Sequence, residues 1–186
     1  MAAIGMQYPV WAEADTESTY KNGIVMGKAV SANLNWQKED NELYGDDAVA
    51  ETDQSITGYT IDVSTTYLEE GVESAILGWK PDSSGEFEIT DDDPPYGGFG
   101  YIRVLKRNGT RMYKTLWYPR IQFAAPNESD NTKQRSINWG TPTISGKGLA
   151  VLNGEGKNRF RQQKVFTTLA AAKSHLNSKA NISSGG

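Results

Sequence analysis

The sequence contains no cysteine and only one histidine, His175. Without cysteine the chain has no disulfide framework, no thiolate nucleophile and no zinc–cysteine site. A single histidine excludes most of the remaining pairings of a nucleophile with a base. His175 lies close to Lys173 in a segment expected to be helical, and we interpret it as a solvated helix residue. The sequence therefore favours a protein that is not an enzyme, and it predicts no cofactor and no bound metal.

Long apolar segments are also missing. No stretch approaches the ~20 apolar residues that a membrane-spanning helix needs. The opening MAAIGMQYPVW has neither a basic leader nor an apolar run, so we expect no signal peptide. The chain is therefore expected to be soluble, to be made in a cytoplasm and to have no membrane partner. Its 186 residues are most simply a single domain.

Acidic residues are scarce in the second half of the chain. Residues 94–186 contain three acidic and fifteen basic groups, a net charge of +12, whereas residues 38–93 contain seventeen acidic groups and two lysines, a net charge of −15. The whole chain carries −4. This division can reflect two solvated surfaces of a monomer. It can also be self-complementary, since a head-to-tail contact between copies closes into rings or grows into filaments.

The strongest local pattern runs from Gly98 to Phe123 and predicts two long β-strands joined by a tight turn. Asn108-Gly109 forms the turn, because both residues tolerate the positive φ of a type I′ hairpin. Aromatic and β-branched residues fill both strands. A two-residue loop fixes the register. The expected facing pairs are Arg107 with Thr110, Leu105 with Met112, Val104 with Tyr113, Ile102 with Thr115, Tyr101 with Leu116, and Phe99 with Tyr118.

Neither face of this hairpin is cleanly polar. An antiparallel sheet that water wets on one side alternates more sharply, so we expect both faces to be covered, one by the chain's own core and one by another subunit. Pro119 removes a hydrogen-bond donor from the ladder. The second strand should therefore bend or reach a sheet edge there.

The rest of the chain is also mainly β in pattern. Periodic apolar residues predict further strands over 24–36, 55–63, 86–90, 135–146 and 160–166. A capping box of Thr66 and Glu69 predicts a helix that ends at Gly78, and Thr167 or Thr168 should cap a short helix near the C-terminus. The predicted fold is a mainly antiparallel β-sandwich or barrel with one flanking helix and this short C-terminal helix. One domain is expected over 1–176, with an N-terminal arm over 1–23 and a flexible tail over 177–186.

Residues 38–54, KEDNELYGDDAVAETDQ, are predicted to form a loop between two strands. Loops longer than ~12–15 residues are usually functional or disordered. One interpretation is a mobile acidic loop or a loose carboxylate cluster for Ca²⁺, although the Asp46-Asp47 spacing does not match an EF-hand. The other is an arm that docks on a neighbouring copy, because the segment also contains apolar residues. The candidate contact residues are Leu43, Tyr44, Asp46, Asp47, Val49 and Glu51 in this segment, and Arg103, Lys106, Arg107 and Arg111 in the basic hairpin.

Four segments together resemble the major tail proteins of long-tailed, non-contractile bacteriophages of Gram-positive hosts, which are tail-tube subunits. The segments are AAIGMQYPVWA at the start, DNELYGDDAVAE (Asp40–Glu51), GFGYIRVLKRNGTRMYKTLWYPRIQFAAP (Gly98–Pro126) and SINWGTPTISG (Ser136–Gly146). Their order and spacing carry the likeness, since no single motif is chemically specific.

The resemblance implies a structural virion protein whose β-sandwich forms rings of six copies, stacked into the hollow tail tube. It implies that the loop matching 38–54 reaches the adjacent ring and that sheets of neighbouring copies join edge to edge around the lumen. The implied partners are other copies and the tape-measure, terminator and distal tail proteins, with transient, non-specific passage of DNA. An acidic inner wall would repel DNA phosphates and let the genome slide.

Two other functions fit the composition. The first is a monomeric β-sandwich module that binds a carbohydrate or a receptor, with Trp11, Trp36, Trp117 and Trp139 as stacking platforms. The second is a small hydrolase that uses acidic residues, which would need two placed carboxylates in a cleft. The aromatic and arginine residues of the hairpin also suit a nucleic-acid platform, but the same hairpin has to supply the core.

Overall fold

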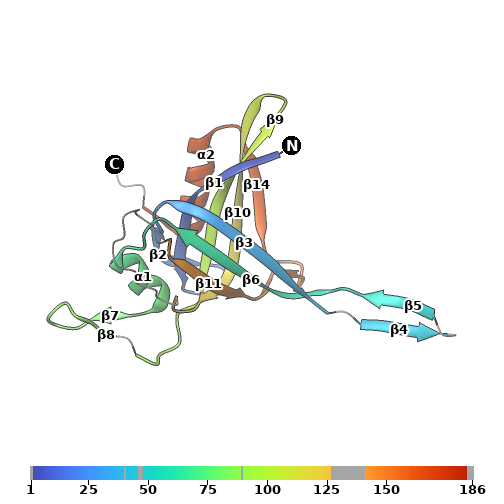
Figure 1. The fold of residues 1–186 in the computed structure, drawn as a ribbon, viewed down its shortest axis with the longest axis horizontal. Helices are drawn as coiled ribbons and strands as arrows, with labels where there is room; N and C mark the ends of the chain where they lie inside the picture. The colour runs from blue at the N-terminus through green and yellow to red at the C-terminus, as the bar shows by residue number, and fades with distance from the viewer. Residues whose placement is uncertain (1, 40, 46–47, 89, 127–140, 184–186) are drawn as a thin grey trace, which may run out of the picture.

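The computed structural model describes residues 2–39, 41–45, 48–88, 90–126 and 141–183, with the backbone alone for 41–45 and 48–53. One large antiparallel sheet dominates it, with strand order β2-β1-β9-β10-β11-β6-β3 and β14 beside β10. The bounds of these strands are β1 Ala2–Ala14, β2 Tyr20–Val25, β3 Ala29–Lys38, β6 Ile56–Thr65, β9 Gly97–Arg107, β10 Thr110–Phe123, β11 Thr143–Gly148 and β14 Gln162–Phe166. The predicted mainly antiparallel β fold with flanking helices is confirmed (Figure 1).

Three short two-stranded ribbons and two helices complete the fold. The ribbons pair β4 (Asn41–Gly45) with β5 (Ala48–Asp53), β7 (Lys80–Pro81) with β8 (Phe87–Glu88), and β12 (Val151–Leu152) with β13 (Asn158–Arg159). The helices are α1 (Glu70–Leu77) and α2 (Leu169–Ala180). In Figure 1 the β9–β10 tip, the β4–β5 ribbon and the β7–β8 ribbon extend from the body in three different directions. In the described part of the chain, no helix is long and apolar enough to cross a membrane.

The central hairpin forms as its sequence predicts. Asn108 and Gly109 have φ values of 47° and 82°, which is the left-handed geometry that a type I′ turn needs. All six expected facing pairs are present, from Arg107 with Thr110 at the turn to Phe99 with Tyr118 near the other end. Local turn chemistry was therefore sufficient to set the register of two long strands.

β10 changes neighbours at Pro119, as the proline predicts. One side of β10 pairs with β9, whereas the other pairs with β14 over Tyr113–Trp117 and with β11 over Ile121–Phe123. The register slips at this point, and two tyrosine hydroxyls bind the carbonyls there. Tyr20 donates to the Pro119 carbonyl at 2.8 Å and Tyr59 to the Arg120 carbonyl at 3.1 Å.

The inner core lies inside the curve of the large sheet. β1 and β3 are far apart in strand order but in contact, and the Met26 amide donates to the Pro9 carbonyl at 2.9 Å, so the sheet curls towards a barrel. Aromatic side chains fill it, and the apolar side of α1 closes it. Its buried members include Trp11, Tyr59, Phe99, Tyr101, Tyr118 and Phe123 from the sheet and Val72, Ile76 and Leu77 from α1.

A second core, called here the helix core, lies on the opposite face of β1, β9 and β10. α2 packs there against the sheet. Its buried residues are Val10, Ala12, Ile102 and Trp117 from the sheet and Ala172, Leu176 and Ala180 from α2. The expectation that another subunit covers this face of the hairpin is therefore wrong. The alanine-rich sequence of α2 gives a weak apolar stripe, so its packing role was not evident.

Two expectations for the chain ends are also corrected. Residues 1–23 are not an arm, because β1 pairs with both β2 and β9 and four consecutive residues in its second half are buried. Pro9 and a left-handed Tyr8 (φ 57°) interrupt the strand there, which hid its periodicity. At the other end α2 continues past the expected tail boundary at 177, and Asn181 ends it in the left-handed conformation (φ 52°).

Two smaller boundaries also differ from the prediction. The strand expected over 24–36 is divided into β2 and β3, because Gly27 turns the chain with φ 96°. α1 begins at Glu70, and its N-cap residue Glu69 makes no capping hydrogen bond through its side chain, so the capping box with Thr66 does not form. Gly78 does end α1 in the left-handed conformation, and Thr168 caps α2 by accepting from the Ala171 amide at 3.3 Å.

Candidate interaction surfaces

The predicted loop over 38–54 is a paired ribbon rather than irregular chain. β3 and β6 remain paired as far as Lys38 and Ile56, with a register shift just before that pair. The Glu39 amide donates to the Ser55 carbonyl at 2.9 Å, and β4 then pairs with β5. Figure 1 shows this β4–β5 ribbon, which we call the arm, pointing away from the body. The sequence did not predict this ribbon, because the segment is rich in Asp and Asn, which disfavour strands. The two long strands that feed it continue their pairing beyond the body.

The arm brings together four of the predicted contact residues. Leu43 pairs with Glu51 and Tyr44 with Val49 across β4 and β5. The other two arm candidates, Asp46 and Asp47, lie outside the described residues. An isolated two-stranded ribbon is only marginally stable in water. The arm is thus an element that another surface would stabilise.

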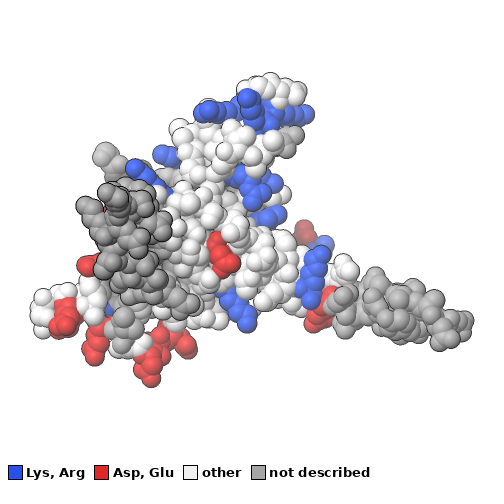
Figure 2. All heavy atoms as spheres, viewed as in Figure 1, with Lys and Arg blue, Asp and Glu red and all other residues white. Residues whose placement is uncertain are grey.

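The four predicted basic contact residues gather at the tip of the β9–β10 hairpin, the basic tip. Lys106 faces Arg111 and Arg103 faces Lys114 across the two strands, and like charges in facing positions are destabilising. Figure 2 shows Lys and Arg crowded at this end. Among the described residues, none of Arg103, Lys106, Arg107 and Arg111 forms an ion pair. Burial lowers the pKa of Lys114, and the positive charges of Arg161 and Arg103 lower it further.

Acidic side chains gather elsewhere, on and after the β7–β8 ribbon. Figure 2 shows Asp and Glu below the body at that side, far in the view from the basic tip. They include Asp82, Glu86, Glu88 and Asp91 to Asp93, all exposed. Asp82 organises the turn by accepting from the Ser84 hydroxyl at 2.6 Å and the Ser84 amide at 2.7 Å. These hydrogen bonds lower the pKa of Asp82. The basic tip and the acidic β7–β8 region are thus separated in space.

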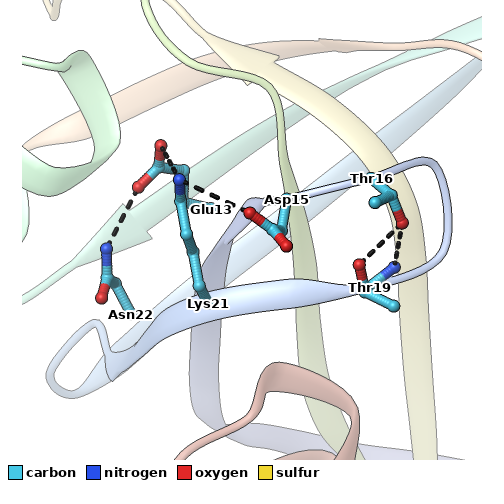
Figure 3. Close-up of polar contacts among 6 residues, drawn as sticks. All are labelled: Glu13, Asp15, Thr16, Thr19, Lys21 and Asn22. Carbon is cyan, nitrogen blue, oxygen red and sulfur yellow. Dashed lines mark hydrogen bonds and ion pairs between the residues drawn. The ribbon is translucent and has the colours of Figure 1, made fainter.

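The polar cluster on the β1–β2 hairpin has a structural role. Figure 3 shows Lys21 between the carboxylates of Glu13, at 3.4 Å, and Asp15, at 3.7 Å. At the turn the hydroxyls of Thr16 and Thr19 lie 2.6 Å apart. Such exposed pairs contribute little stability each, but together they link the two strands at the turn. Across the described residues, no group of three or more His, Asp or Glu side chains is placed to hold a metal ion.

Two of the four tryptophans cannot form the stacking platforms of the carbohydrate-binding alternative. Trp11 and Trp117 are only 1% and 2% exposed, so that role is wrong for both. Trp36 is partly buried against Tyr59 and Phe160, and the Arg161 guanidinium lies 5.4 Å from its ring centre. The fourth platform residue, Trp139, lies outside the described residues.

His175 is not simply solvated, as the sequence suggested. Its ring lies 5.2 Å from that of Phe166, and it borders a polar cavity of about 400 Å³ beside α2. Burial lowers its pKa, and the positive charges of Lys179 and Lys164 lower it further. The sequence did not predict this cavity, because its walls come from three segments far apart in the chain.

No known protein-family model matches this sequence, and a search of curated proteins finds no relative of it.

Proposed function

We propose that this chain is a structural subunit of a bacteriophage tail tube, in which rings of six copies stack into a conduit for DNA during ejection. The arm is the observation that carries the proposal. It extends the pairing of β3 and β6 into a ribbon that points away from the body. A ribbon of this kind is stabilised when it lies on another surface, and in a stack of rings that surface is the adjacent ring.

The edges of the large sheet support assembly within a ring. β2 and β3 end the strand order, and β14 pairs only with β10 among the described strands. Unpaired strand edges carry free backbone donors and acceptors that another chain can pair with. A closed ring of copies uses such edges without leaving any open, and it therefore avoids uncontrolled aggregation.

The separated charges support the stacking direction. The basic tip and the acidic β7–β8 region lie at different places on the body, so a head-to-tail arrangement brings opposite charges together. Other tail proteins at the ends of the tube, such as the terminator and distal tail proteins, are partners under this proposal. The protein then works in the virion and catalyses no reaction.

Negative-stain electron microscopy of the concentrated protein tests the proposal. We expect rings or tubes with a central channel, and sedimentation velocity should show association that increases with concentration. A solitary monomer at high concentration, even after addition of the other tail proteins, would contradict the tail-tube assignment. A monomer that binds a glycan would support the carbohydrate-binding alternative instead.

A further inference from the structure

The polar cavity beside α2 lies where three distant parts of the chain meet. The β1–β2 turn forms one wall, the β13–β14 segment another, and α2 the third. The cavity measures about 400 Å³, which is within the range of small-ligand sites. The residues that line it are Ser18, Tyr20, Arg159, Gln162, His175, Ser178 and Lys179.

Two positive groups converge on this cavity without a counter-ion. Arg159 and Lys179 line it together with His175, and no carboxylate does. Among the described residues, neither Arg159 nor Lys179 forms an ion pair. Lys179 donates only to the Gln162 side-chain oxygen, at 2.9 Å. A cationic site that lacks a carboxylate in a folded protein is a site at which an anion relieves repulsion.

The hydrogen-bonding state of the walls identifies free donors. The Nε of Arg159 is buried and has no hydrogen-bond partner in the described structure, and a buried donor without a partner is unfavourable. Tyr20 is unavailable, since its hydroxyl already donates to the Pro119 carbonyl at 2.8 Å and its ring packs edge-on against Trp117 at 5.0 Å. Tyr20 therefore forms a fixed wall. Arg159 and Lys179, by contrast, have no negatively charged partner among the described residues.

We propose that this cavity binds a phosphate-type oxyanion, held by Arg159 and Lys179 with the Ser18 hydroxyl as a further donor; the Ser178 hydroxyl already donates to the Ser174 carbonyl at 3.0 Å. The planar guanidinium donates two parallel hydrogen bonds to a phosphate group, and the ammonium adds a compact charge. A hydroxyl donor suits a third oxygen of a phosphate, which a carboxylate does not have. The site is independent of the tail-tube assignment.

His175 reports on the occupancy of this site. Its pKa is lowered by burial and then by Lys179 and Lys164. Burial also lowers the pKa of Lys179, and the positive charge of Arg159 lowers it further. An anion beside these groups favours the protonated ring, so binding should raise the pKa of His175 by about one unit. Because His175 is the only histidine in the chain, its ring protons are identified in a proton NMR spectrum without an assignment.

The experiment follows the His175 ring signals while inorganic phosphate is added at constant ionic strength, with chloride and acetate as parallel titrations. We expect a saturable shift and a raised pKa with phosphate, weak effects with acetate and none with chloride. A second arm with a 5′-mononucleotide shows whether an esterified phosphate binds as free phosphate does. Arg159→Gln and Lys179→Gln should each weaken phosphate binding about tenfold or more, because each removes a charged hydrogen bond.

Lys157→Gln is the matched control, since Lys157 is exposed, pairs with Glu155 at 3.6 Å and does not line the cavity; it should leave binding unchanged. Circular dichroism checks that each variant is folded. Equal shifts with phosphate and chloride in the unaltered protein would overturn the proposal. Acetate binding as tight as phosphate, or full binding in both pocket variants, would overturn it as well.

Discussion

Gly100 faces Trp117 directly across the β9–β10 ladder, and the space above the glycine is occupied by the indole ring. A Cβ at position 100 would lie 2.7 Å from Cε3 of Trp117 and 3.1 Å from a methyl carbon of Leu176 in α2. Gly98 gives the same ring similar room. The glycines in β9 therefore allow the large buried side chain of β10 and the C-terminal helix to share one face of the sheet.

Replacing Gly100 with Ala should destabilise the fold by about 1–3 kcal/mol, the usual cost of overpacking a filled core. Trp117 and α2 would have to shift, so denaturant unfolding should show the lower stability and the tryptophan emission should change. Gly71→Ala is the control, because nothing lies within 4 Å of a Cβ there. That variant should be neutral or stabilised by up to about 1 kcal/mol. An unchanged Gly100→Ala protein would show that the ring is loosely held.

Removal of the arm should separate folding from assembly. Glu39 and Ser55 are hydrogen-bonded at its base, so residues 40–54 can be replaced by Asn-Gly, which closes a two-residue hairpin. We expect the thermal unfolding midpoint of the monomer to change little, since the inner core and helix core are untouched. Tubes should no longer form in electron micrographs. Normal tubes from the shortened protein would refute the role of the arm in stacking.

Lys106→Glu should increase the folding stability of the monomer and weaken the association between copies. In the monomer the change replaces a like-charge pair with Arg111 by an opposite-charge pair, a gain of about 0.2–1 kcal/mol for facing residues. In the assembly it removes charge from the basic tip. Chemical denaturation and sedimentation velocity measure the two effects, with Lys157→Glu as a control of equal charge change. Association that is unaffected by Lys106→Glu, or by salt, would exclude an electrostatic contact at the tip.

His175 should make the protein less stable in acid. Its folded pKa lies below the usual 6.5, because of burial and then of Lys179 and Lys164, so the unfolded chain takes up this proton at a higher pH than the folded chain. The contribution of the neutral His175 ring to the free energy of unfolding is complete above pH 6.5 and is lost as the pH falls through the folded pKa. His175→Gln should therefore lose less stability than the unaltered protein between pH 7.5 and 5, measured by urea unfolding. Identical losses would mean that the ring titrates normally.

Sequence reasoning succeeded where local chemistry determines the structure. Asn108-Gly109 requires one turn type, and that turn set the facing pairs of the hairpin as far as Phe99 and Tyr118. Pro119 and Gly78 likewise act through their own backbone geometry, so the strand break and the end of α1 were predictable. The division of charge was also visible in the sequence, although only the fold shows that it separates the basic tip from the β7–β8 region.

Other features depend on partners that lie far along the chain. The strand β1 is not evident in the sequence, because its pairing with β9 leaves no periodic signal around Tyr8 and Pro9. The β4–β5 ribbon is not evident either, because its residues disfavour strands and only the pairing of β3 with β6 continues into it. The cavity at His175 needs residues from both ends of the chain. No local pattern brings them together.

The position of β1 between β2 and β9 has a consequence for synthesis. β1 leaves the ribosome before both of its partners, and one of them ends only at Arg107. At about 5–20 residues per second, the nascent strand waits on the order of 5–20 s for that neighbour. During this interval its open side is a template for other nascent chains, so crowded polysomes and the timing of chaperone engagement should strongly influence the yield of native protein.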